Sequence, residues 1–239
     1  MKSILKYPFF LALDISSPSD AWKFLQEHQL NIGGVKLGPK LILNAGWDFV
    51  TKASKIAPVF LDFKFYDIPS VTLSAVKQSF DLGASFVTVH ASIGAEALSL
   101  IYDFEKEANK TRAFKVLAVS ILTSFAEDKQ LPHWKDGKII DKVKCLANLV
   151  KQSGLKGFVC SPEDLKYLKP LYPEFFFVTP GIRLNSDLKK IENDDQNRIL
   201  TPSEALQEGS DALVIGRPVY NNENPSNILK SIILDCKNK

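Results

Sequence analysis

The stretch LDFKFYDIP, residues 61–69, follows a short apolar run and precedes a helical pattern. It is therefore expected to form the carboxyl end of a buried strand and the loop that leaves it. Side chains two residues apart on a strand share a face, so Asp62 and Lys64 lie side by side, whereas Phe63 and Phe65 point into a packed layer. An acid and a base are acceptable in a buried place when they are paired, and such a pair at a strand end is a candidate for chemistry.

A third charged residue, Asp67, lies past this strand and just before Ile68-Pro69. Proline fixes its own backbone and disfavours helix for the residue before it, so the Asp67 carboxylate is held in a defined turn. For Asp62 and Lys64 alone, a salt bridge that only caps a barrel is an equal alternative, because structural ion pairs also perturb pKa values. The three alternating charges are too many for one salt bridge, and they favour a functional site.

Short apolar runs alternate with helical patterns along the whole chain of 239 residues. Strands are expected near residues 9–14, 34–37, 59–64, 86–90, 116–121, 157–160, 175–179 and 212–215, with helices between them, for example over 19–28, 70–82, 139–152 and 203–207. This rhythm is typical of β-α units and a parallel sheet. Eight units predict a (β/α)8 TIM barrel that occupies residues 1–239 as a single domain, with reactive groups at the carboxyl ends of its strands.

Polar residues occur at the strand ends where a barrel enzyme needs them. The first strand is expected to end in Asp14, and alternation along the second strand turns Lys36 toward the barrel mouth. His90 ends the fourth strand, and we favour a structural role for it because no carboxylate near it in sequence is placed to orient it. After the fifth strand, Leu122-Thr123-Ser124 offers hydroxyl and backbone groups that could bind a flat heterocycle, although a Thr-Ser pair is also an ordinary turn.

Candidate anion ligands follow the seventh and eighth strands, the usual place of phosphate sites in barrels. The sequence TPGIR at 179–183 opens a polar loop that runs to Arg198, and we expect this loop to become ordered when a phosphate-bearing ligand binds. After the eighth strand, Gly216 permits close backbone approach and Arg217 can hold a phosphate with two hydrogen bonds. A turn with a solvated arginine is the alternative, but two such segments at one end of the barrel favour a phosphate site.

Composition excludes several kinds of partner. With 30 Lys and Arg against 27 Asp and Glu, the net charge of +3 is too small and too evenly scattered to indicate nucleic acid or an anionic membrane. No apolar run reaches transmembrane length, and the short run at 7–13 lacks the cleavage site of a signal peptide. Cys145, Cys160 and Cys236 are odd in number and have no metal-ligand spacing, so a reducing cytoplasm fits best.

The motif DxKxxDIP at 62–69 resembles the signature of the orotidine 5'-phosphate decarboxylase family, and the sequences PGIR (180–183), DDQ (194–196) and IGRP (215–218) match further patterns of that family. The resemblance implies a cofactor-free and metal-free lyase that converts orotidine 5'-monophosphate to UMP in pyrimidine biosynthesis. It implies a catalytic tetrad of Lys36, Asp62, Lys64 and Asp67, of which Lys36, Asp62 and Asp67 also bind the substrate. It further implies substrate or phosphate contacts at Asp14, Thr123, Arg183, Gln196, Gly216 and Arg217.

The chain departs from the family pattern after the DIP motif. A polar residue followed by Thr is usual there, whereas here Ser70 is followed by Val71 and then Thr72. The substrate contact of the family's threonine is therefore assigned either to the Thr72 hydroxyl or to the backbone N–H of Val71. The resemblance also implies a homodimer in which Asp67 reaches into the active site of the partner subunit.

The mechanism implied by the resemblance places Lys64 beside carbon C6 of the substrate as the proton donor. Without a cofactor, the carbanion that develops as CO2 leaves must be stabilised by preorganised charge, and the Lys64 ammonium supplies it. A related barrel that decarboxylates or cleaves phosphosugars with Mg²⁺ is one alternative, although interleaved lysines repel a metal. A barrel that only binds a phosphate ligand is another, but it has no use for Asp62.

Overall fold

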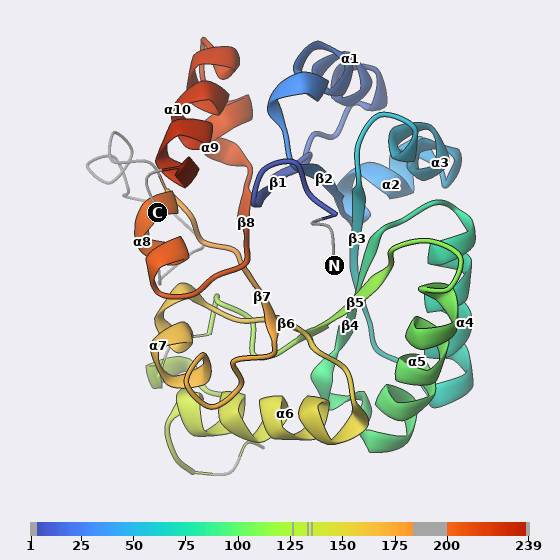
Figure 1. Ribbon diagram of the computed structural model, residues 1–239, viewed down its shortest axis with the longest axis vertical. Helices are drawn as coiled ribbons and strands as arrows, with labels where there is room; N and C mark the ends of the chain where they lie inside the picture. The colour runs from blue at the N-terminus through green and yellow to red at the C-terminus, as the bar shows by residue number, and fades with distance from the viewer. Residues whose placement is uncertain (1–3, 126, 133, 135, 184–199, 238–239) are drawn as a thin grey trace.

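The computed structural model describes residues 4–125, 127–132, 134, 136–183 and 200–237. Within them, eight parallel strands close into a barrel in the order β1 to β8. The helices surround this barrel (Figure 1). The strands are β1 Phe9–Ala12, β2 Gly34–Leu37, β3 Val59–Phe65, β4 Phe86–His90, β5 Lys115–Val119, β6 Gly157–Val159, β7 Phe176–Thr179 and β8 Ala212–Ile215. The (β/α)8 prediction is confirmed.

Ten α-helices and four short 3-10 helices connect the strands in the described part of the chain. The α-helices are α1 Pro18–His28, α2 Pro39–Ala45, α3 Asp48–Ser54, α4 Pro69–Asp81, α5 Ala95–Ala108, α6 Ile139–Ser153, α7 Leu165–Leu168, α8 Pro202–Gln207, α9 Arg217–Tyr220 and α10 Pro225–Lys237. The 3-10 helices are η1 Gln29–Asn31, η2 Ala91–Ile93, η3 Glu127–Lys129 and η4 Pro162–Asp164. None of these helices is long and apolar enough to cross a membrane.

Local sequence explains where several helices begin and end. The Ser17 side chain accepts a hydrogen bond from the Asp20 N–H at the start of α1, and Thr201 and Glu204 form a capping box at the start of α8. Pro69 occupies the first turn of α4, where a missing N–H costs nothing. Because the helix begins there, the loop between β3 and α4 is short and residues 66–68 stay close to the barrel mouth.

The barrel interior below the mouth is filled by a layer of apolar side chains. Phe10, Phe60 and Phe86 come from β1, β3 and β4, and the ring centroid of Phe10 lies 5.0 Å from that of Phe60 and 4.9 Å from that of Phe86. All three are almost completely buried, and they pack with Leu5, Leu117, Val178 and Ala212. We call this set the phenylalanine layer. Among the described residues, it fills the barrel interior beneath the cavity that the site residues line.

Most expected strand limits are correct to within one or two residues. The strands over 34–37, 86–90 and 212–215 have the expected bounds, but β1 ends at Ala12 and not at Asp14. Leu13 still donates a backbone hydrogen bond to Lys36 O, so the ladder stops just before Asp14. β5 likewise ends at Val119 and not at Ile121. The ranges expected for these two strands were too long because their apolar runs continue past the last paired residue.

Candidate active site

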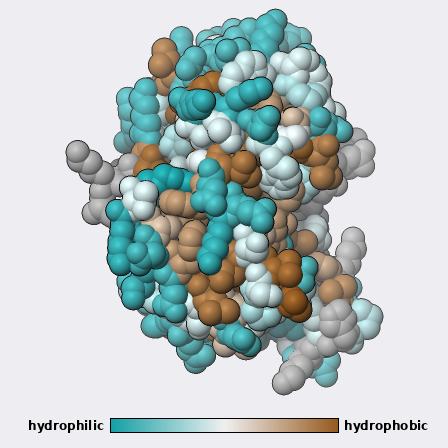
Figure 2. Space-filling view, turned by 90° about the vertical axis from the view of Figure 1, so that its right-hand side faces the viewer, coloured by the Kyte–Doolittle hydropathy of each residue, from teal (hydrophilic) through white to brown (hydrophobic). Residues whose placement is uncertain are grey.

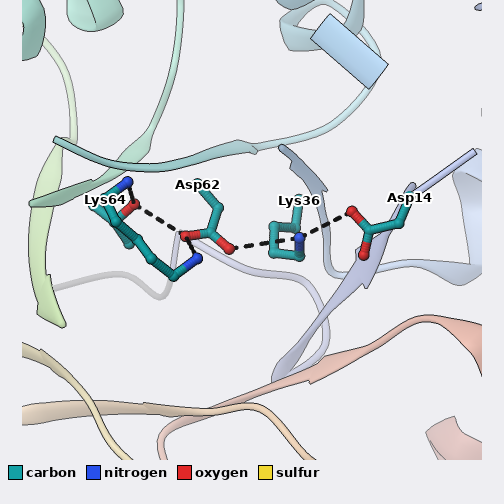
Figure 3. A network of polar contacts seen from close by, with 5 residues as sticks. Asp14, Lys36, Asp62 and Lys64 are labelled. Atoms are coloured by element: carbon teal, nitrogen blue, oxygen red, sulfur yellow. Dashed lines mark hydrogen bonds and ion pairs between the residues drawn. The ribbon is translucent and has the colours of Figure 1, made fainter. Parts of the chain in front are cut away.

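Four charged side chains form a row across the barrel mouth (Figure 3). The Lys36 ammonium lies 3.3 Å from Asp14 Oδ1 and 3.5 Å from Asp62 Oδ2, and the Lys64 ammonium lies 2.9 Å from Asp62 Oδ1. Negative and positive charges therefore alternate along the row. We call these four residues the charged row. Three of the four tetrad residues implied by the sequence, Lys36, Asp62 and Lys64, lie together in it.

These residues come from neighbouring strands of the sheet, with Asp14 just after β1, Lys36 on β2, and Asp62 and Lys64 on β3. Lys36 pairs with Ala12 on β1 and with Phe60 on β3, so its side chain rises between the ends of those strands. The ladder between β3 and β4 becomes irregular between Leu61 and Phe65. Lys64 lies in that irregular part with a φ of +50°, which L residues rarely adopt.

Burial and neighbouring charges shift the pKa values of Lys36 and Asp62 in opposite directions. Burial alone would lower the pKa of Lys36, but Asp62 and Asp14 outweigh it, so the pKa of Lys36 is raised above its ordinary value. Burial alone would raise the pKa of Asp62, but Lys36 and Lys64, with hydrogen bonds from Lys64 and Thr88, lower it below its ordinary value. Both groups are therefore ionised over the neutral pH range.

The charged row borders a cavity of about 360 Å³. Phe60 of the phenylalanine layer forms part of its lining, and Val119, Ile121, Leu122, Val159 and Val214 give it an apolar wall. Of the predicted contact residues, the cavity is lined by Asp14, Lys36, Asp62, Lys64, Thr123, Arg183, Gly216 and Arg217. Eight predicted site residues thus surround one space that combines a charged side, an apolar side and a cationic end.

Arg183 and Arg217 form the cationic end of the cavity. Arg183 follows β7, is 8% exposed, and donates a backbone hydrogen bond to Leu200 O at 3.0 Å. Arg217 begins α9, directly after Gly216. A Cβ atom at Gly216 would lie 3.1 Å from the Ala12 Cβ, so glycine lets β8 approach β1 closely at this point. The two guanidinium groups therefore come from the segments in which barrels commonly hold phosphate.

Asp67 lies outside the charged row of its own chain. It is exposed, it is not part of the cavity lining, and its Oδ1 accepts a hydrogen bond from the Ile68 N–H at 2.7 Å. Thr72 is fully buried, and its hydroxyl bonds to the Asp67 main chain, which fixes this turn. Val71 is 46% exposed on the outer side of the same turn. Gln196 lies outside the described residues, as does most of the loop that runs to Arg198.

His90 has a local structural contact. Its Nδ1 accepts a hydrogen bond from the Ser92 N–H at 3.2 Å, and its ring stacks on Tyr66 at 5.3 Å. Burial and the nearby Lys64 both lower the pKa of His90. These contacts are local structural ones, and the structural role expected for His90 stays a prediction.

Two residues that lie near the charged row were not predicted from the sequence. Thr88 on β4 donates a hydrogen bond to Asp62 Oδ1, and Tyr220 at the end of α9 lines the cavity between the row and the arginines. Burial, together with Asp14, raises the pKa of the Tyr220 hydroxyl. Alternation from His90 would have pointed to Thr88, and helical spacing from Arg217 would have pointed to Tyr220.

The fold and site define a (β/α)8 barrel whose cavity has a cationic end formed by Arg183 and Arg217 and a charged row at the carboxyl ends of β1 to β3. Comparison with known proteins identifies the family of this barrel. Residues 7–232 match the orotidine 5'-phosphate decarboxylase / HUMPS family. The chain is 35% identical over 227 residues to the orotidine 5'-phosphate decarboxylase of Legionella pneumophila strain Paris, covering 94% of this chain and 97% of that protein. It is 38% identical over 224 residues to that of Vibrio campbellii, covering 93% and 94%.

A solved structure of an orotidine 5'-phosphate decarboxylase is also similar to this chain. The crystal structure of orotidine 5'-phosphate decarboxylase from Lactobacillus acidophilus superposes with a TM-score of 0.82 at 30% identity, covering 97% of this chain and 99% of that one. The chain therefore belongs to the orotidine 5'-phosphate decarboxylase / HUMPS family. Within that family, its relatives place it with the decarboxylases, which are carboxy-lyases of pyrimidine biosynthesis.

Proposed function

We propose that the protein decarboxylates orotidine 5'-monophosphate to UMP without a cofactor, and that Lys64 donates the proton that replaces CO2 at C6. The observation that carries this proposal is the charged row, in which a lysine and an aspartate lie 2.9 Å apart beside the cavity. A cofactor-free decarboxylation needs fixed charge at the place where negative charge develops. The Lys64 ammonium meets that need and carries a transferable proton.

The orientation of the substrate follows from the two ends of the cavity. Arg183 and Arg217 are suited to the 5'-phosphate, and Asp14 and Lys36 can bond to ribose hydroxyls between the phosphate and the base. The pyrimidine then reaches the side where Lys64 lies. Thr123 and the apolar wall are placed to contact its flat faces and edges.

Asp62 has two roles in this scheme. It holds the Lys36 and Lys64 ammonium groups at 3.5 Å and 2.9 Å, and it faces the carboxylate that leaves the substrate. Two negative charges about 4 Å apart repel by roughly 4 kcal/mol at an intermediate effective dielectric. That repulsion disappears as CO2 departs. We give more weight to the fixed lysines, because they stabilise the charge that forms in the transition state.

We further propose a homodimer in which Asp67 of one subunit completes the site of the other. Asp67 is exposed and lies away from the row of its own chain, although it belongs to the same motif. Large apolar side chains surround it on the surface: Tyr66 is 67% exposed and Ile68 is 62% exposed. Figure 2, which views the side of the barrel where α4 lies, shows hydrophobic groups interrupting the hydrophilic surface. Exposed apolar groups of this kind favour a protein contact.

The decisive experiment is the loss of orotidine 5'-monophosphate absorbance on mixing with the purified protein in EDTA. We expect full turnover in the chelator, because the charged row supplies the electrostatic stabilisation that a metal would otherwise provide. The control is the same assay after Mg²⁺ is restored. Activity that is lost in EDTA and regained with Mg²⁺ would favour the metal-dependent alternative. We also propose a cytoplasmic location, supported by Cys145 and Cys236, which are free thiols.

The shared site can be tested by mixing two inactive variants. Lys64→Ala and Asp67→Asn are each expected to be nearly inactive. Random pairing of equal amounts makes about half of the dimers mixed, and each mixed dimer has one intact site, so about a quarter of parental activity should return. No recovery after demonstrated subunit exchange would place Asp67 in the site of its own subunit.

A further inference from the structure

One buried hydroxyl group contacts two members of the charged row. Thr88 lies on β4 with no exposed surface. Its Oγ1 donates a hydrogen bond to Asp62 Oδ1 at 3.0 Å and accepts one from the backbone N–H of Lys64 at 2.8 Å. These directions are fixed by chemistry, because an amide N–H only donates and an ionised carboxylate only accepts. A single side chain therefore connects β4 to both the acid and the base of β3.

The backbone of Lys64 needs such a support. Its φ of +50° is the only positive φ outside glycine in the part of the chain that the structure describes. Residues persist in this conformation where their surroundings hold them there. The pairing of β3 with β4 is irregular between Leu61 and Phe65, so the regular ladder is interrupted around Lys64. The Lys64 N–H donates its hydrogen bond to the Thr88 hydroxyl, which is a side-chain acceptor.

The same hydroxyl restricts the Asp62 carboxylate. Oδ1 receives hydrogen bonds from both Lys64 Nζ and Thr88 Oγ1, and Oδ2 faces Lys36 Nζ at 3.5 Å. The three partners lie on β2, β3 and β4. Rotation of the carboxylate would therefore break contacts to three different strands. Thr88 is the one neutral partner among them, so its contribution is directional more than electrostatic.

We propose that Thr88 is a positioning residue for decarboxylation: its hydroxyl holds the Lys64 backbone in the left-handed conformation and orients the Asp62 carboxylate, so that the Lys64 ammonium faces the reacting carbon. Thr88 does not line the cavity, so it acts through Lys64 and Asp62 and not on the substrate. This inference rests on the proposed role of Lys64. It adds a residue on another strand that keeps the geometry on which that role depends.

The test compares variants that keep or remove the hydroxyl. Thr88→Val retains the shape of the side chain but leaves the Lys64 N–H without its acceptor. We expect kcat to fall about 30-fold or more, while KM and the Kd for UMP change less than about threefold, because displacement of the reacting group affects the transition state more than product binding. Thr88→Ser retains the hydroxyl and should keep kcat within about fivefold of the parent. If the valine variant does not fold, Thr88→Ala replaces it in the test, because alanine is smaller than threonine and adds no atoms to the packed site.

Two controls show whether a loss of activity depends on the charged row and on the Thr88 hydroxyl. Ser79→Ala removes a buried hydroxyl that bonds to Ala75 O on α4, away from the row, and should leave kcat unchanged. Lys64→Ala is assayed in parallel. If Lys64→Ala is inactive while folded Thr88→Val or Thr88→Ala turns over at the parental rate, the Thr88 proposal alone is wrong. If Lys64→Ala turns over normally, the proposed function itself fails. A serine variant as slow as the valine variant would also overturn the role of the hydroxyl.

Discussion

The phenylalanine layer and the charged row occupy the same barrel interior, and on β3 they are only two residues apart. On β3, Phe60 belongs to the layer and Asp62 to the row, and on β4, Phe86 belongs to the layer while Thr88 bonds to the row. The alternation of a strand turns all four side chains inward. The layer is held by apolar burial and ring packing, whereas the row is held by ion pairs and hydrogen bonds. One end of the barrel therefore provides stability, and the other provides reactivity.

This difference shows how a rigid scaffold can hold costly charges. Lys36 and Asp62 are mostly buried, with side chains 11% and 12% exposed, so each needs the other to remain ionised. The apolar layer beneath them has few alternative arrangements because its aromatic rings interlock. It ties β1, β3 and β4 together directly beneath the row. Stability at the lower end thus supports preorganisation at the mouth.

The largest expected effect comes from the row. Lys64→Ala should lower kcat by roughly 10³-fold or more, because it removes both the stabilising charge and the proton donor. The Kd for UMP should change little, since this role is confined to the transition state. Steady-state kinetics and UMP titration measure the two effects. Arg217→Ala is the matched control with the opposite pattern, in which binding weakens more than kcat. If Lys64→Ala turned over at the parental rate, the assignment of Lys64 as the proton donor would be wrong.

A substitution in the layer should act on stability instead. Phe86→Ala is expected to lower the free energy of unfolding by about 3–5 kcal/mol, the usual cost of a cavity left by a buried phenylalanine. Urea unfolding measures it, and Leu30→Ala, at a residue that is 74% exposed, is the control, with an expected change within about 0.5 kcal/mol. A loss below about 1 kcal/mol for Phe86→Ala would mean that the layer does not carry the stability assigned to it.

The sequence predicted the barrel, and eight of the residues that it singled out line one cavity, because both results depend on short-range patterns. Strand alternation was enough to bring Lys36, Asp62 and Lys64 together, and the segments after β7 and β8 placed Arg183 and Arg217 at one end. Resemblance to the family added roles to these residues, and it alone singled out Gln196.

What the sequence did not predict depends on partners far along the chain. The left-handed backbone of Lys64 has no local signal, since lysine does not favour it, and it is supported by a hydroxyl 24 residues away. Thr88 itself is hidden in a strand, where threonine is common for its β propensity alone. The role of Asp67 also could not be predicted from the residues alone. Its expected contacts come from another subunit, and no contact within one chain reveals them.

The smallest expected effect is on stability, which should depend on pH in the charged row and not in the phenylalanine layer. Because the row lowers the pKa of Asp62 below its ordinary value, its ionised form stabilises the fold at pH values above the unfolded-state pKa of about 3.9. That contribution decreases as the pH falls from the unfolded-state pKa through the lower folded-state pKa. The pKa of Lys36 is raised, so its contribution is complete in this acidic window and is lost only at alkaline pH.

Asp62→Asn should therefore be less stable than the parent by about 3 kcal/mol at pH 7, since it leaves two ammonium groups without their shared partner. Urea unfolding at pH 7, 5 and 3.5 should show this difference nearly constant between the first two values and smaller at the third. The difference between the parent and Phe86→Ala should not change over the same range, because no titrating group takes part in the layer. If the Asp62→Asn difference grew at pH 3.5, the Asp62 carboxylate would have a raised pKa in the folded state, and the row could not be the ion-paired array that its distances indicate.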